Sequence, residues 1–233
     1  MKFKTVEDLK KAYPSAFKKD GSVDLTAKTE IEELPENWHV PGTLSLRQCT
    51  GLTRIPDGLN VGWGLDMRRC KNVSHIPDDL RVGQSMVFTG NDLVKHLPKY
   101  LTLGGSLFLS DLSNLEAMPL CLKVGKDVSI AHCDSLREVG MHLDLRGNLS
   151  IKRCADLTEV KAEINIEGSL WLSEMPAMEA VAPQSRIRGD IIIDDCPGLS
   201  DVDPIFYCTE ILGAVTVDGK KVWPCPEPET PAP

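Results

Sequence analysis

The chain is poor in aromatic residues and in cationic charge. Phe, Trp and Tyr make up 5% of its 233 residues, so its core has to be built from Leu, Ile and Val. Lys and Arg total 26 against 34 Asp and Glu, which gives a formal net charge of −8. Because binding to nucleic acid or to an anionic membrane depends on cationic side chains, we expect neither partner.

Long apolar runs are missing as well. No stretch approaches 18 consecutive apolar residues, so no membrane-spanning helix is predicted. The first residues, Met1 to Asp8, contain no apolar core of a signal peptide, and we therefore expect no Sec signal and a cytoplasmic location.

The usual signatures of catalysis and of metal binding are absent. The eight cysteines form no Cys-x-x-Cys pair and have no histidine in register, so no zinc site is expected. The glycines lack the strand–loop–helix setting of a phosphate site. No Ser/His/Asp or Cys/His constellation stands at coherent positions. We therefore predict no enzyme, no catalytic residue, no cofactor and no metal.

What the sequence does contain is a repeat of 21 residues without insertion or deletion. Its first position is apolar and is followed by proline in the first five repeats. The repeat begins at Leu34, Ile55, Ile76, Leu97, Met118, Val139, Val160 and Val181. Eight full repeats therefore occupy residues 34–201, and such a period is typical of a solenoid.

Five columns of the repeat are apolar, at positions five, seven, eleven, thirteen and nineteen, with Ser185 as the one polar member. Within a repeat Leu59 and Val61, then Leu65 and Met67, alternate with period two, which indicates extended chain with one buried face. A glycine follows the first pair, and we expect it to take a positive φ at a corner. The predicted fold is a β-rich solenoid of eight coils with two short strands per coil.

The sixteenth column is rich in cysteine. It reads Cys49, Cys70, Asn91, Leu112, Cys133, Cys154, Met175 and Cys196. Stacked coils would place such thiols about 5 Å apart, which would suit either a metal or redox ladder or a row of small buried hydrophobes. We favour buried thiols, with Asn91 bonding loop backbone in the same slot.

This column completes a resemblance to a known family. The segment Leu44-Ser-Leu46-Arg-Gln-Cys49-Thr-Gly-Leu52 resembles the conserved part of leucine-rich repeats. The following residues, Leu52 to Gly62, are similar to repeats of this type found in bacterial and phage proteins, and more distantly to the repeats of bacterial effectors. The extra apolar pair per repeat departs from common leucine-rich repeats. The resemblance implies a leucine-rich-repeat-like scaffold for recognition or assembly, and it implies no reaction.

Both ends of a solenoid expose apolar cross-section and need caps. Residues 1–33 are predicted to form an N-terminal cap with a short helix that Thr5 begins. Residues 202–223 are predicted to form a C-terminal cap, a β-hairpin that turns at Asp218-Gly219.

The chain ends in a proline-rich segment. Residues 224–233 contain five prolines and are expected to form an extended, mobile tail. Cys208 and Cys225 lie on either side of the predicted hairpin and are a candidate disulfide, with two free thiols as the alternative. Cys121 lies outside the cysteine column and is a candidate exposed thiol, either incidental or able to cross-link to a neighbouring subunit.

The twelfth column is expected to point outward from the strands, yet part of it is apolar. The candidate partner-binding residues are Val87, Phe108, Trp171 and Ile192. Charges flank them, with Arg47 and Arg68 near the N-terminal end and Asp194 near the C-terminal end. Cross-strand stacking on a solvated surface would explain the same residues without a partner, and this alternative stays open.

These observations favour a non-enzymatic scaffold for protein–protein interaction or assembly. The expected partner is a protein, either a capsid or other assembly subunit or another copy of the chain. The resemblance to phage-borne repeats extends this to a virion structural component, such as a capsid-surface or decoration protein. One alternative is a bacterial effector or host-target recognition module. Another is a glycan-binding or glycan-cleaving solenoid, for which Asp190, Asp194 and Asp195 are the one carboxylate cluster.

Overall fold

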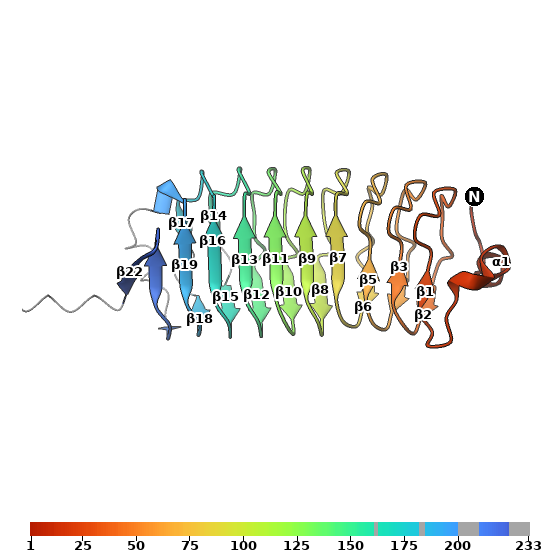
Figure 1. The fold of residues 1–233 in the computed structure, drawn as a ribbon, viewed down its shortest axis with the longest axis horizontal. Coiled ribbons are helices and arrows are strands. Elements are labelled where there is room, and N and C mark those ends of the chain that lie inside the picture. The colour runs from red at the N-terminus through yellow and green to blue at the C-terminus, as the bar shows by residue number, and fades with distance from the viewer. Residues whose placement is uncertain (161–162, 182–184, 200–209, 224–233) are drawn as a thin grey trace, which may run out of the picture.

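The computed structural model shows a parallel β-solenoid of about nine turns with one short helix at its N-terminal end (Figure 1). The structure describes residues 1–160, 163–181, 185–199 and 210–223. The strands of successive turns lie side by side along one elongated axis, and the chain advances along it from the N-terminus (Figure 1). A solenoid of 21-residue coils with little helix is therefore confirmed.

One side of the solenoid is an eleven-stranded sheet, called here the long sheet. Its strands, in spatial order, are β1 (Val23–Asp24), β3 (Leu44–Ser45), β5 (Leu65–Asp66), β7 (Met86–Thr89), β9 (Leu107–Ser110), β11 (Val128–Ala131), β13 (Leu149–Lys152), β16 (Leu170–Ser173), β19 (Ile191–Asp194), β21 (Val215–Val217) and β22 (Lys220–Trp223). From β1 to β19 each residue pairs with the residue 21 positions later, as Leu44 does with Leu65. The repeat period is thus the register of the sheet.

A second side of the solenoid carries two shorter sheets, which together are called here the second sheet. It consists of β2 (His39–Val40), β4 (Asn60–Val61) and β6 (Arg81–Val82), followed by β8 (Tyr100–Leu103), β10 (Cys121–Val124), β12 (His142–Leu145), β15 (Glu163–Ile166), β18 (Arg186–Ile187) and β20 (Glu210–Ile211). The strands from β2 to β6 form one parallel sheet and those from β8 to β20 another, and within each sheet the pairing follows the repeat period up to β18.

The return segment of each coil, expected to be a loop, forms a third line of parallel pairing. Single bridges join Arg54 to His75 and His96 to Ala117, and β14 (Glu159–Val160) pairs with β17 (Ala180–Val181). Three lines of pairing around the coil make a three-sided cross-section. The two strands per coil that the sequence predicts are present, and this third side is additional.

The apolar columns form the core. All forty positions of the five columns, in eight repeats, are buried, including the polar Ser185. Side chains of stacked coils therefore pack in continuous rows along the axis, and this burial is the main stabilising term of a solenoid.

The glycines between the strand pairs have a different role from the expected one. None of the eight has a positive φ, so the prediction of a left-handed corner there was wrong. A Cβ on Gly83 would lie 2.1 Å from the carbonyl oxygen of Gly62, and one on Gly125 would lie 2.4 Å from that of Gly104. Glycine is needed here because backbones of adjacent coils approach too closely for a side chain.

A left-handed residue recurs instead at the fifteenth position of every repeat, after the strand of the long sheet. The φ values at this position are between 53° and 66°, in Gln48, Arg69, Gly90, Asp111, His132, Arg153, Glu174 and Asp195. Seven of these eight are not glycine. Because a left-handed conformation costs a residue with a Cβ roughly 1 kcal/mol, the stacked backbone must enforce this corner.

The N-terminal helix α1 (Val6–Ala12) begins at Thr5, whose Oγ1 accepts a hydrogen bond of 3.1 Å from the backbone N–H of Asp8. Its buried Leu9 joins the end of the core, and a 3₁₀ turn, η1 (Pro14–Ala16), follows. The long sheet already begins at Val23, which pairs with Leu44. The solenoid therefore extends by one strand to the N-terminal side of the repeats.

At the other end a second 3₁₀ turn, η2 (Pro197–Leu199), precedes the last strands. Strands β21 and β22 pair antiparallel and turn at Asp218 and Gly219, which have φ values of 47° and 73°. Cys208, Cys225 and the tail of residues 224–233 lie outside the described residues. Within the described residues no helix is long and apolar enough to cross a membrane.

Candidate functional site

The outward surface of the long sheet carries the candidate residues from the twelfth column. Phe108 is 42% exposed and Trp171 is 45% exposed, whereas Val87 and Ile192 are half-buried. Val87 pairs with Phe108 on the adjacent strand, and Trp171 pairs with Ile192. The structure therefore brings the four residues together as two pairs, called here the aromatic pairs.

Two serines separate the aromatic pairs. Ser129 pairs with Phe108 on one side and with Ser150 on the other, and Ser150 pairs with Trp171. Three coil spacings of about 4.8 Å place the two aromatic residues about 14 Å apart along the axis. The surface between them is a floor of small polar side chains.

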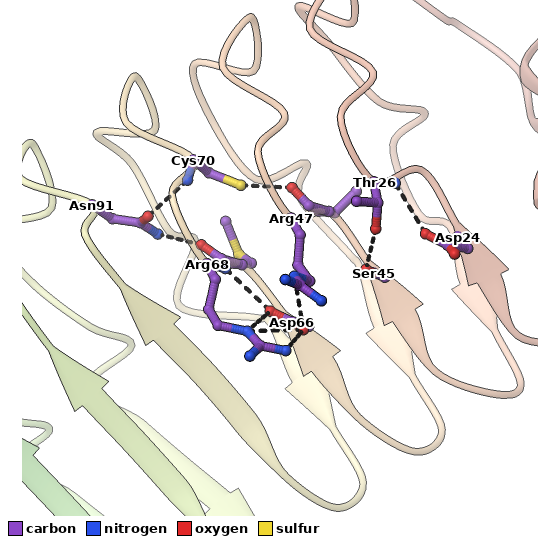
Figure 2. A network of polar contacts seen from close by, with 10 residues as sticks. Asp24, Thr26, Ser45, Arg47, Asp66, Arg68, Cys70 and Asn91 are labelled. Carbon is purple, nitrogen blue, oxygen red and sulfur yellow. Dashed lines mark hydrogen bonds and ion pairs between the residues drawn. The ribbon is translucent and has the colours of Figure 1, made fainter.

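Charged side chains cluster on the same surface toward the N-terminal end (Figure 2). Both Asp66 oxygens accept bonds from the Nε of Arg68, at 2.9 and 3.1 Å, and the Nε of Arg47 lies 4.0 Å from Asp66 Oδ2. The bond to Asp66 raises the pKa of the Arg68 guanidinium. One carboxylate is thus shared by two arginines, and Asp24, which pairs with Ser45 one coil earlier, adds a second carboxylate near Arg47.

The C-terminal end of the surface carries both carboxylates and the exposed lysines Lys220 and Lys221 of β22. Asp218 Oδ1 accepts a bond of 2.9 Å from the backbone N–H of Asp195, and Asp194 closes β19 next to it. Within the described part of the chain, none of these three carboxylates has a cationic partner. Glu174 differs, because bonds from Arg153 and Lys152 hold its pKa below the usual range.

The cysteine column is a structural ladder. The thiol of Cys49 donates to the carbonyl oxygen of Leu25 at 3.0 Å, and that of Cys70 donates to Leu46 at 2.8 Å. Burial raises the pKa of Cys49 to about 11 and that of Cys70 to about 12. Cys49 and Cys70 therefore stay protonated and donate to the preceding coil, in keeping with the preferred interpretation. The thiols of Cys133, Cys154 and Cys196 donate instead to carbonyl oxygens of their own coil, two residues earlier in the chain. In the described ranges no group of three or more His, Cys, Asp or Glu is placed to hold a metal ion.

The carboxylates considered for glycan cleavage do not gather. Asp190 lies before β19, and its Oδ1 accepts the backbone N–H of Ala214 at 2.8 Å. Asp194 lies at the other end of the same four-residue strand. Four residues of extended chain, roughly 13 Å, separate the two, and Asp190 is held in a structural bond.

A row of chemically active side chains on the second sheet was missed from the sequence. Tyr100, Cys121, His142 and Glu163 are paired in register on consecutive strands, and His142 Nδ1 lies 3.0 Å from Glu163 Oε2. They occupy the fourth position of consecutive repeats, so reading that column down would have found them. Cys121 itself is half-buried and free.

This row lacks the surroundings that acyl transfer needs. The backbone N–H groups of Cys121, His142 and Glu163 all donate to carbonyl oxygens of the preceding coil. None of these three N–H groups is therefore free to stabilise an oxyanion. Stabilisation of the oxyanion is usually the largest single contribution to catalysis in such sites. The row is an exposed ladder rather than an assembled active site.

A shallow groove of about 680 Å³ lies on the return side of the coils, near His75 and His96. Leu93 and Leu120 on its rim are 46% and 43% exposed. Its lysines are partnered, since Lys95 contacts Glu116 at 3.3 Å and Lys99 contacts Asp78 at 3.5 Å. The groove could not be predicted from the sequence, because its two leucines lie outside the apolar columns.

Comparison with known proteins adds no relative: no protein family, no curated protein and no solved structure matches this chain.

Proposed function

We propose that this chain is a non-enzymatic scaffold for protein–protein interaction or assembly, and that the outward surface of the long sheet is its binding surface. The observation that carries the proposal is the exposure of Phe108 and Trp171 on that surface. Large aromatic side chains are the commonest anchors of protein interfaces, because they bury much apolar area at little cost in rotamer entropy.

The rigidity of the solenoid supports this function. The coils are held together by backbone pairing along the continuous long sheet and by buried rows of side chains, so the outward residues have fixed spacings. A partner that matches this surface would bind with little ordering of the scaffold, which favours affinity.

The proposal is tested by affinity capture with cross-linking mass spectrometry from the source lysate or particle. The wild type is compared with the double variant Phe108→Ser/Trp171→Ser, and with Tyr100→Ser as the matched control on the second sheet, where Tyr100 is 71% exposed. We expect the double variant to lose its cross-links to other proteins and the control to keep them. Equal capture by all three proteins would contradict the binding surface.

The finer setting that we propose is a virion, with the chain as a capsid-surface or decoration component. It is supported by the segment Leu52 to Gly62, which is similar to repeats found in bacterial and phage proteins. Purified particles should then contain the chain in a fixed ratio to the capsid subunit. Its absence from such particles would remove this setting and leave the recognition module of a bacterial effector, whose capture would yield one host protein.

A glycan ligand is a second candidate for the same surface. Trp171 offers an exposed ring, and charged side chains of Lys152 and Glu174 lie on the neighbouring strands and their corner. Binding on a glycan array that is lost in Trp171→Ser and retained in Tyr100→Ser would favour this candidate over a protein partner.

A further inference from the structure

We propose that the partner of this surface is a second copy of the chain, bound face to face with its solenoid axis antiparallel. This inference rests on the proposed function and names the partner of the same surface. It begins from the order of the twelfth column on successive strands, which is Val87, Phe108, Ser129, Ser150, Trp171 and Ile192. This order is the same in chemical character from either end: aliphatic, aromatic, serine, serine, aromatic, aliphatic.

This order fits a two-fold axis that runs parallel to the strands and passes between Ser129 and Ser150. Rotation about this axis reverses the direction of the solenoid, and each column of one copy then faces the same column of the other. Phe108 then faces Trp171 of the second copy, and Val87 faces Ile192 of the second copy. Both apolar contacts form twice, as in any self-complementary interface. The fourteenth column agrees, because the small polar Ser110 and Ser173 become partners.

The charges select the same orientation. Arg68 stands in the fourteenth column on one side of the centre, and Asp218 continues that column on the other side, after Asp194. The antiparallel arrangement places Arg68 against Asp218 of the other copy. A parallel arrangement would set like charges opposite each other, which disfavours it.

The size of the surface sets the strength of the contact. Nine coils of about 4.8 Å and strands of about 13 Å give roughly 560 Å² per copy, or about 1,100 Å² in total. This is at the lower limit of specific interfaces, so the dimer should be weak, with a Kd in the micromolar range. Its ionic part should weaken as the salt concentration rises.

Sedimentation equilibrium of the full chain, up to about 1 mM, tests the association. We expect a monomer–dimer equilibrium in the wild type and in Tyr100→Ser, and a Kd at least tenfold higher in Phe108→Ser and in Trp171→Ser. Circular dichroism confirms that each variant is folded. A wild type that stays monomeric, or one that grows beyond the dimer, would overturn the inference.

Spin-label distances test the orientation. The labels are placed at Thr89→Cys and Ser45→Cys in a background where Cys121, Cys208 and Cys225 are serine. In the antiparallel dimer the label at position 89 lies five coils from the same label in the other copy, and the label at position 45 lies nine coils away. The expected distances are about 25 Å and about 45 Å. Similar distances at the two positions would indicate a parallel dimer and overturn the proposal.

The two proposals fail in different ways. If the wild type is monomeric but Phe108→Ser/Trp171→Ser loses a captured protein, the scaffold function stands and self-association falls. If no protein is captured and no dimer forms, both fall. A dimer whose Kd does not change in Phe108→Ser and Trp171→Ser would place self-association elsewhere and overturn this inference.

Discussion

The side chain of Asn91 is hydrogen-bonded to the backbone of the preceding coil at Cys70. Its Oδ1 accepts the backbone N–H of Cys70 at 2.9 Å, and its Nδ2 donates to the carbonyl oxygen of Met67, also at 2.9 Å (Figure 2). Cys70 repeats the second of these bonds one coil earlier, through its thiol. One slot of the coil therefore accepts either a thiol or an amide, provided that it donates to the same carbonyl column.

Replacing Asn91 by alanine should be strongly destabilising. The buried N–H of Cys70 and carbonyl of Met67 would both lose their partner, at about 1–3 kcal/mol for each group. We expect the free energy of unfolding in urea to fall by about 2–4 kcal/mol. Asn114→Ala, which removes an exposed bond to the carbonyl oxygen of Asp92, is the control and should cost less than about 1 kcal/mol. Equal losses in the two variants would contradict the role of Asn91.

The buried thiols should make the solenoid less stable at alkaline pH. The pKa of Cys70 is raised to about 12 in the fold, and an unfolded thiol has a pKa of about 8.5. Because the folded pKa is the higher one, the stabilisation is complete below pH 8.5 and is lost as the pH rises toward 12. We expect a fall of up to about 1.4 kcal/mol per pH unit for each such thiol.

The variant Cys70→Asn isolates this effect, because Asn91 shows that an amide fits the slot. Chemical unfolding between pH 8 and pH 11 should show a shallower loss of stability in Cys70→Asn than in the wild type. The two proteins should be similar at pH 7. Parallel curves would mean that the thiol does not cause the alkaline loss.

Cys121 should react with iodoacetamide before the other described cysteines. It is half-buried on the second sheet, whereas Cys49, Cys70, Cys133 and Cys154 are fully buried and Cys196 nearly so. Since alkylation needs an accessible thiolate, the five buried thiols should be labelled only on unfolding. Mass spectrometry of the native and the urea-unfolded protein gives the order of labelling, and early labelling of Cys70 would contradict its buried position.

The stability of the fold should depend on the type of residue at the fifteenth position of the repeat, where the backbone is left-handed. His132 has a φ of 54° and is exposed, so β-branched Val there would be strained. We expect His132→Val to lower the unfolding free energy by about 1–2 kcal/mol, and His132→Gly to change it by less than about 1 kcal/mol. His142→Val in strand β12, where extended backbone suits Val, is the matched control and should cost less than His132→Val.

The candidate surface could be predicted in part. Phe108 and Trp171 stand out because they are apolar in a column that alternation assigns to the outside, and the structure exposes both. The row from Tyr100 to Glu163 could also have been found, by reading the fourth column down the repeats. The groove beside Leu93 could not, because it depends on which side of the coil a position occupies, and this is decided by corners that the sequence does not mark.

The sequence by itself determined the period, the register and the core. A repeat of 21 residues without insertion allows each coil to stack in one register only, and five apolar columns define what is buried. The third line of pairing and the left-handed corners were decided by the tertiary structure. The corner residues vary from Gln48 to Asp195 and share no side-chain chemistry. Their backbone conformation is imposed by hydrogen bonds between neighbouring coils, which exist only once the coils have stacked.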